Sequence, residues 1–298
     1  MKTTCPLCGG GDSRPSWLGA TNYLDRAFEF VECLSCETLY CDPMPDADVL
    51  GEMYGPSYEK VLVRGAEMDD PKEPGRVVKR LRDSPRGVFL DYGCGPGALL
   101  IEAQTLGWEA VGVEFDGRVV AAVADRIGAR VLTVAEADAV ESSLADVLHL
   151  GDVIEHLTDL DRQMPRILRL LKPGGVLIAQ GPLEGNGSLF IAALRFAHWA
   201  RGRRLSRLPP YHVMLATAKG QRTFFNRFGL EEIEFTMSEV SWPAPSRISL
   251  KDLARPRQAG LFLVRRASQA CSRLRPDHWG NRYFYAGRQR GLGGGEPT

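Results

Sequence analysis

A glycine-rich loop between an apolar segment and a helical one constrains this chain more than any other feature. The loop is Asp91-Tyr92-Gly93-Cys94-Gly95-Pro96-Gly97, and it follows the apolar residues Val88-Phe89-Leu90. Glycines let a backbone turn sharply and lie close to a ligand, as nucleotide-binding turns require. Gly93, Gly95 and Ala98 also satisfy a relaxed dinucleotide fingerprint. The loop therefore predicts a nucleotide-binding turn and by itself leaves NAD binding open.

Short apolar runs alternate with helical segments from Gly87 onward, which is typical of βαβ units around a parallel sheet. We expect strands at 88–90, 110–113, 131–134, 147–150 and 176–179, and two more at 231–236 and 283–285. Helices are expected at 98–106, 118–127, 160–171, 189–199, 219–228 and 257–271. Pro165 is expected near the first turn of its helix. The pattern predicts an α/β domain.

Two acidic residues help to indicate which kind of ligand the loop binds. Glu114 ends the second expected strand about twenty residues after the loop, where a carboxylate binds ribose hydroxyls in either kind of nucleotide site. Asp91 comes directly before the glycines, where it would repel a pyrophosphate but attract an ammonium group. The position of Asp91 favours a ligand with a cationic amino-acid end.

Four motifs follow one another in an order typical of one enzyme family. After Asp91–Gly97 come Glu114, then Gly151-Asp152-Val153-Ile154-Glu155-His156-Leu157, then Leu170-Leu171-Lys172-Pro173-Gly174-Gly175. These segments resemble the motifs of class I S-adenosylmethionine-dependent methyltransferases, closely over residues 87–180 and more loosely to about 286. The resemblance implies a Rossmann-like, seven-stranded sheet that is mostly parallel, with its last strand antiparallel.

The same resemblance implies which residues hold S-adenosylmethionine. The methionine end would lie at Asp91 and the loop glycines, the ribose at Glu114, and the adenine amino group at Asp138 or, less in keeping with the pattern, Glu136. Asp152 would lie at the mouth where cofactor and substrate meet. The implied cofactor-binding residues are Asp91, Gly93, Gly95, Gly97, Glu114, Asp138 and Asp152.

Two Cys-x-x-Cys pairs stand near the N-terminus, 24 residues apart. Four thiolates in two tight turns suit a tetrahedral Zn²⁺ site, and close cysteine pairs in a reducing compartment indicate metal binding more than disulfides. The expected ligands are Cys5, Cys8, Cys33 and Cys36. Cys41 has no partner at this spacing and is left out of the set. The sequence predicts a small structural zinc module.

Histidine is the natural base for a hydroxyl acceptor, because its side chain titrates near neutral pH. His149 lies in an apolar strand and is expected to be a satisfied core residue. His156, just after the fourth strand, and His212, in Pro209-Pro210-Tyr211-His212, are the candidate catalytic residues. The alternatives are that His156 orients its loop and that His212 packs beside prolines.

Composition shifts along the chain divide it into segments. We expect a zinc-ribbon-like module at 1–42, a Pro-rich helical linker at 43–84 and the methyltransferase domain at 85–290. Residues 181–215 read as a lid within that domain, and residues 291–298 as a disordered tail. N-terminal ribbons followed by such a linker resemble those of methyltransferases from polysaccharide and natural-product pathways. That resemblance implies a small-molecule or glycan acceptor.

Charge and hydropathy bear on partners and location. The net charge is zero, and residues 1–42 carry three basic against six acidic side chains, which disfavours nucleic acid. An RNA methyltransferase that grips nucleic acid through its ribbon, and a non-catalytic relative that only binds S-adenosylmethionine, remain the alternatives. With no secretory signal and no apolar run long enough to cross a bilayer, we expect a cytoplasmic protein.

An arginine-rich run lies beside an amphipathic segment within the proposed lid. The run holds Arg201, Arg203, Arg204 and Arg207, and it follows the apolar side chains of Leu194, Phe196 and Trp199. Such a run is most often a solvated surface. The alternative is contact with a phosphorylated carrier or an anionic membrane surface.

Overall fold

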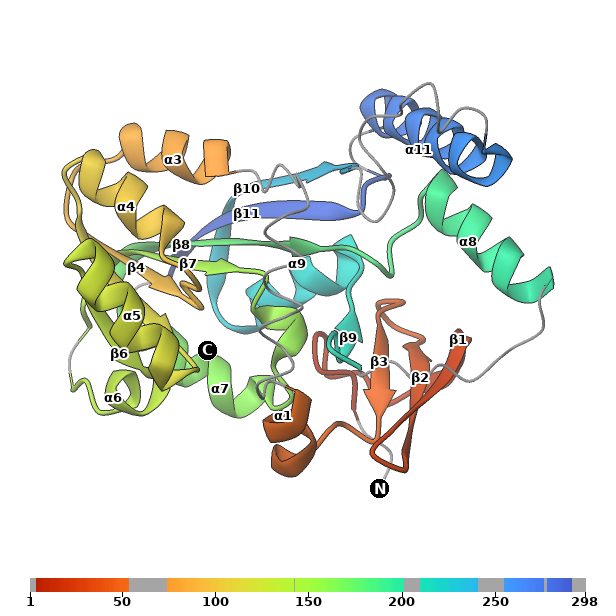
Figure 1. Cartoon of the computed structure of the whole chain (residues 1–298), viewed down its shortest axis with the longest axis horizontal. Helices are drawn as coiled ribbons and strands as arrows, with labels where there is room; N and C mark the ends of the chain where they lie inside the picture. Colours follow the sequence, from red (N-terminus) through yellow and green to blue (C-terminus); the bar gives the residue numbers. More distant parts are fainter. Residues whose placement is uncertain are drawn as a thin grey trace, which may run out of the picture. The chain divides into compact units, whose positions relative to one another are not determined.

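The computed structural model describes residues 4–53, 74–141, 143–200, 210–240, 255–275 and 278–290, which fall into two compact units (Figure 1). The first unit groups residues 1–71 with 182–223 and 236–283. The second groups residues 72–181 with 224–235 and 284–298. Of residues 181–215, predicted as a lid of the catalytic domain, the described residues 182–200 and 210–215 cluster with the N-terminal cysteine segment. The arginine run at 201–207, residues 54–73 of the linker and the tail at 291–298 lie outside the described residues.

The second unit is built on a seven-stranded sheet with the order β10-β11-β8-β7-β4-β5-β6. Its strands are β4 (Val88–Tyr92), β5 (Glu109–Glu114), β6 (Arg130–Thr133), β7 (Ala145–Gly151), β8 (Leu171–Pro182), β10 (Leu230–Ser238) and β11 (Arg282–Gln289). The pairs β6–β5, β5–β4, β4–β7 and β7–β8 are parallel. The sheet is mostly parallel with one antiparallel strand, which confirms the predicted Rossmann-like fold class.

Helices cover this sheet because its strands are apolar on both faces, as parallel strands usually are. Helices α3 (Pro74–Arg82), α4 (Ala98–Thr105) and α5 (Gly117–Ile127) share one buried cluster with β4 and β11. Phe284 of β11 belongs to this cluster, whereas the ring of the next residue, Tyr285, stacks on Phe225 at 3.8 Å between centroids. Phe225 lies in α9 (Ala218–Arg227). Successive strand residues thus point to opposite faces and bury both.

The chain around α7 (Leu160–Leu168) differs from the prediction in two ways. Pro165 lies inside the helix, not near its first turn. The helix begins at Leu160 because the Asp159 side chain caps it by accepting from the Arg162 N–H, so the proline falls in a later turn. The following strand starts at Leu171, which pairs with Ala145 before a shift in register. The Lys-Pro-Gly-Gly segment is an irregularity within β8.

The first unit contains a four-stranded sheet with the order β1-β2-β3-β9. Its strands are β1 (Ser13–Tyr23), β2 (Arg26–Cys33), β3 (Leu39–Asp42) and β9 (Met214–Leu215), and each pairing is antiparallel. The unit also holds α1 (Ala47–Met53), α8 (Leu189–Ala200) and α11 (Pro256–Leu274). Helices α8 and α11 pack against each other. Within the described ranges, no helix is long and apolar enough to cross a membrane.

Candidate functional site

Asp91 stands at the end of β4, directly before the glycine turn. Its register partner on the neighbouring strand β7 is His149. The His149 Nδ1 lies 2.7 Å from the Asp91 Oδ1, and the two residues are only 2% and 4% exposed. A carboxylate buried to this degree requires hydrogen-bonding partners. The pairing with His149 supplies one and fixes the orientation of the carboxylate.

The glycine turn has a left-handed backbone at three positions, with φ of 81° at Gly93, 48° at Gly95 and 76° at Gly97. Side chains at two of them would collide with neighbours. A Cβ at Gly93 would lie 2.6 Å from Val153 Cγ2, and one at Gly97 would lie 2.8 Å from Val123 Cγ1. A Cβ at Gly95 would meet no atom within 4 Å. The turn therefore leaves open space beside Gly95, where a ligand can approach the backbone.

Glu114 at the end of β5 fastens the turn to the neighbouring strand. Its Oε2 accepts from the Gly95 N–H at 2.8 Å, and its Oε1 accepts from the Phe115 N–H at 2.7 Å. A carboxylate has about four acceptor sites, so two such bonds leave capacity for hydroxyl donors. Glu114 is thus held beside the glycine turn, and its binding of ribose stays a prediction.

Cys94 lies within the same turn and is buried. Burial raises its pKa to about 12, so the thiol stays protonated at neutral pH. A Cβ at Gly112 of β5 would lie 2.8 Å from the Cys94 sulfur. Cys94 therefore fills space between the turn and β5.

The end of β7 carries Asp152 in a left-handed conformation, with φ of 55°. Such a backbone is uncommon for a residue with a side chain and tends to occur at functional positions. The Asp152 N–H donates to the Gln180 carbonyl of β8 at 2.9 Å. His156 ends the short 3-10 helix η1 (Ile154–His156), which follows immediately. The structure thus places Asp152 and His156 just beyond the carboxyl end of β7, where open α/β sheets bind their ligands.

The two acids considered for adenine both lie in helix α6 (Val134–Asp138), and each has a partner outside it. Asp138 forms an ion pair with Arg166 at 3.0 Å. Glu136 closes a capping box with Thr133, and the bond from the Thr133 backbone N–H lowers the pKa of the Glu136 carboxyl. Adenine recognition by either residue stays a prediction.

His212 lies in the first unit, before β9. Its Nδ1 is 2.6 Å from the Glu184 Oε2, and both side chains are about one third exposed. When a carboxylate accepts from Nδ1, the proton is held on that nitrogen and Nε2 is left as the basic atom. The Glu184–His212 pair has the chemistry of an oriented general base.

Sequence reasoning missed the partners of these residues. His149 was expected to be a satisfied core side chain, yet its Nε2 is buried without a hydrogen-bond partner. Its ring also lies over Gly151, where a Cβ would be 2.5 Å from the His149 Cε1. The only available signal was that His149 and Asp91 each lie in a central strand, and the register that pairs them is not visible in the sequence.

Replacing His149 by leucine is expected to lower the free energy of unfolding by about 2 kcal/mol, because the Asp91 carboxylate would lose a buried partner. Replacement by asparagine, whose amide nitrogen can stand near the position of Nδ1, should restore most of this loss. Urea denaturation of the two variants measures the difference. Equal destabilisation by both substitutions would show that the ring's volume matters and the hydrogen bond does not.

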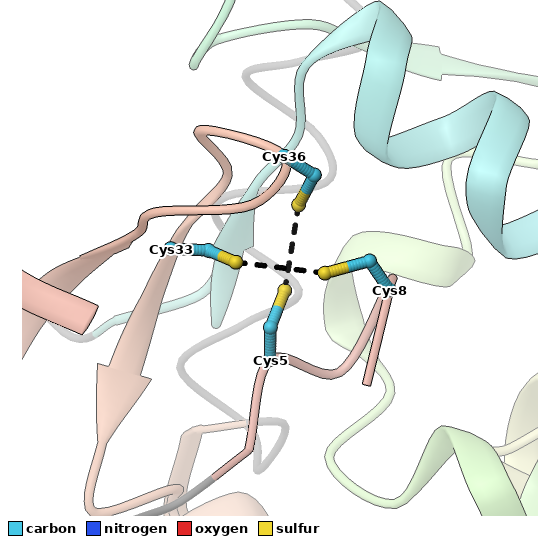
Figure 2. A group of neighbouring side chains, drawn as sticks. All are labelled: Cys5, Cys8, Cys33 and Cys36. Carbon is cyan, nitrogen blue, oxygen red and sulfur yellow. Dashed lines mark hydrogen bonds between the residues drawn. The ribbon is translucent and has the colours of Figure 1, made fainter. Parts of the chain in front are cut away.

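The four cysteines of the two Cys-x-x-Cys pairs converge on one point (Figure 2). Their sulfur atoms all lie within 4.8 Å of one another, with 3.6 Å from Cys5 to Cys36 and 3.5 Å from Cys8 to Cys33. Four sulfurs around a tetrahedral Zn²⁺ would be about 3.8 Å apart, given Zn–S bonds of about 2.3 Å. The donor set therefore fits a tetrahedral thiolate-bound metal.

The local backbone explains why the sulfurs converge. In the first pair the Gly9 N–H donates to the Cys5 carbonyl, and in the second the Glu37 N–H donates to the Cys33 carbonyl. Each pair is thus a tight turn beside the antiparallel sheet. Cys41 lies in β3 outside this group, and burial raises its pKa to about 12.

The second turn is also held by a segment far away in the sequence. The Thr217 hydroxyl donates to the Cys36 carbonyl at 2.6 Å and accepts from the Gly220 N–H at 3.0 Å, so it caps the start of α9. A Cβ at Gly220 would lie 2.3 Å from the Thr38 hydroxyl and 3.2 Å from Leu7. The cysteine cluster and the first turn of α9 are therefore packed as one body within the first unit.

Comparison with known proteins places these observations in a family. A family model described as a methyltransferase domain matches residues 67–234, which is more than half of the chain. A ubiquinone biosynthesis O-methyltransferase of Rhodopseudomonas palustris is 33% identical over 113 residues, covering 36% of this chain and 44% of that protein. A ribosomal protein L11 methyltransferase of Bordetella bronchiseptica is 28% identical over 201 residues, covering 52% and 62%.

Among solved structures, a SAM-dependent methyltransferase from Archaeoglobus fulgidus aligns over 72% of this chain and 94% of its own, with 16% identity and a TM-score of 0.45. The match to the Rhodopseudomonas enzyme spans less than half of that enzyme's length. The family model covers strands β4 to β8, the glycine turn and the acids described above. Because this family model matches more than half of its length, the chain belongs to the methyltransferase-domain family.

Proposed function

We propose that this protein is an S-adenosylmethionine-dependent methyltransferase whose cofactor binds at the turn after β4. The observation that carries the proposal is the buried Asp91 carboxylate beside a glycine turn with open space at Gly95. A buried anion at that point complements the ammonium group of the cofactor's methionine end and would repel a pyrophosphate. Membership of the methyltransferase-domain family supports the same assignment.

The residues present fit the cofactor. Asp91 would hold the ammonium group, the backbone beside Gly95 would line the methionine chain, and Glu114 would accept from the ribose hydroxyls. Asp152 would border the reacting end of the site. S-adenosylmethionine supplies a methyl group on a sulfonium whose leaving group is neutral, so alignment of the acceptor can provide much of the rate enhancement.

We further propose a small-molecule or glycan hydroxyl as the acceptor, in polysaccharide or natural-product biosynthesis. The match to an O-methyltransferase supports transfer to oxygen. A hydroxyl must lose its proton as the carbon–oxygen bond forms and the sulfur–methyl bond breaks. The Glu184–His212 pair supports a general base, with Nε2 taking the proton and later releasing it to solvent. His156 is the second candidate for this role.

An assay of S-adenosylhomocysteine release against hydroxyl and amine acceptors tests the proposal. With a hydroxyl acceptor, His212→Ala should lower kcat about 100-fold or more, since positioned bases contribute on this scale. His156→Ala is the parallel variant, and His278→Ala, at an exposed position, is the matched control. Full activity in both the His156 and His212 variants would contradict a histidine base. Preference for amine acceptors would contradict O-methylation.

We also propose that Cys5, Cys8, Cys33 and Cys36 bind a structural Zn²⁺. The converging sulfur atoms and the two tight turns support this. All four ligand positions of a tetrahedral ion would be taken by protein, which is typical of structural and not of catalytic zinc. The ion would stabilise the small antiparallel sheet of the first unit.

A further inference from the structure

Helix α8 presents an apolar stripe to solvent. Leu189, Ala192, Phe196 and Trp199 are exposed and follow the spacing i, i+3, i+7 and i+10, which places them on one helix face. Phe196 and Trp199 are 67% and 75% exposed, with ring centroids 5.8 Å apart. Large aromatic side chains at such exposure are rare on a surface that remains in water.

Helix α11, which packs beside α8, carries a second stripe of the same kind (Figure 1). Leu263, Ala267, Ala270 and Leu274 are exposed at i, i+4, i+7 and i+11. Leu263 is 66% exposed and Leu274 is 82% exposed. The two helices of this pair thus each leave an apolar face uncovered by the described part of the chain.

The charges on this helix pair all have one sign. Neither 189–200 nor 256–274 contains an aspartate or a glutamate. Exposed arginines flank the stripes at Arg195 on α8 and at Arg266 and Arg273 on α11. Arg195 lies over the Trp17 ring at 5.3 Å and Arg266 over the Phe262 ring at 5.1 Å. Guanidinium groups therefore border apolar and aromatic surface, as they do in helices that lie in a membrane interface.

The apolar stripes and the surrounding arginines distinguish two surfaces that could cover them, a second copy of the chain and an anionic bilayer. A second copy of the chain would bring arginines against arginines, which is unfavourable at close range. An anionic bilayer offers phosphates to the arginines and an apolar boundary to Phe196, Trp199 and the leucines. We propose that the α8–α11 pair is a docking surface for an anionic membrane, with both helices lying in the headgroup region. This proposal is independent of the proposed methyl transfer.

Co-sedimentation of the full chain with vesicles tests the proposal. We expect binding to phosphatidylcholine vesicles that contain phosphatidylglycerol, weak binding to pure phosphatidylcholine, and loss of binding as salt is raised. The double variant Phe196→Ser, Trp199→Ser should lower the partition coefficient on the order of tenfold or more. Arg266→Gln with Arg273→Gln should lower it roughly fivefold for each arginine removed.

The matched control is Ile101→Ser with Ile233→Ser, which removes two exposed apolar side chains from the second unit. It should bind vesicles as the unchanged protein does. Circular dichroism melting must show that every variant folds, and a variant with a lowered melting point is replaced by Phe196→Gln or Trp199→Gln. Equal binding by the aromatic variants and the control would overturn the proposal. So would a dimer in light scattering that the aromatic variants abolish, or binding to polyglutamate in place of vesicles.

Discussion

Asp91→Ala is expected to weaken the binding of S-adenosylhomocysteine about 100-fold, because the variant removes the anion proposed to hold the ligand's ammonium group. The carboxylate is buried and oriented by His149, so solvent screens it little and water cannot easily replace it. Isothermal titration calorimetry of the two proteins measures the change.

The ligand 5′-methylthioadenosine, which lacks the amino-acid end, separates this contact from general damage to the site. Its affinity should be the same in the Asp91→Ala variant and the unchanged protein. Asp125→Asn, at an exposed position on α5, is the control for removing a carboxylate from this unit. If both ligands lost affinity equally, Asp91 would be needed to maintain the conformation of the turn and would not bind the ammonium group. If the unchanged protein bound neither ligand at micromolar concentration, the proposed function itself would be wrong.

Removal of the proposed zinc is expected to unfold the four-stranded sheet of the first unit. Metal binding of this kind supplies on the order of 10 kcal/mol of folding free energy, which is comparable to the whole stability of a typical domain. Cys36→Ser should release the metal, which elemental analysis measures against about one zinc ion per chain in the unchanged protein. Amide exchange should then rise over residues 5–42.

The same experiment tests the packing of α9 on the cluster. Exchange should also rise over residues 214–220, because Thr217 bonds to the Cys36 carbonyl and Gly220 packs on Leu7 and Thr38. Residues 88–114 of the second unit serve as the internal reference. Cys41→Ala is the matched control, since this buried thiol lies outside the cluster, and it should keep its metal. Unchanged amide exchange in the Cys36→Ser variant would contradict a structural zinc site. So would the visible absorbance of thiolate-bound iron in the unchanged protein.

Much of the second unit could be predicted from local pattern. Each expected strand from 88–90 to 283–285 is present, and central runs such as 110–113 and 176–179 are continuously apolar because both faces of a parallel sheet are covered. The errors lie where local signals compete. The helix begins at Leu160 as expected, with its cap at Asp159, so Pro165 falls in a later turn and not in the first. The strand at Leu171 begins before its glycines because Leu171 pairs with Ala145, a long-range contact.

Part of the candidate site could likewise be predicted from the sequence, and part could not. Gly93 and Gly97 were visible in the sequence because glycine adopts their left-handed backbone without the steric cost that a side chain brings. The cysteine pairs were visible because their spacing within each turn fixes two sulfurs at a time. The pairing of Asp91 with His149 was not visible, since it depends on strand register. The capping of α9 by Thr217 against Cys36 was hidden as well, because the two residues are separated by more than half of the chain.

The sequence by itself determined the features that depend only on neighbouring residues. These are the glycine turn, the acids at strand ends and the two Cys-x-x-Cys pairs. The tertiary structure alone decided which residues far apart in the sequence meet. Examples are His149, which bonds to Asp91, and Thr217, which bonds to the carbonyl of Cys36 in the second Cys-x-x-Cys pair. It also decided that residues 182–200 and 210–223 share a unit with the cysteine cluster. The physical reason is that local preferences act over a few residues, whereas packing and register depend on segments that only folding brings together.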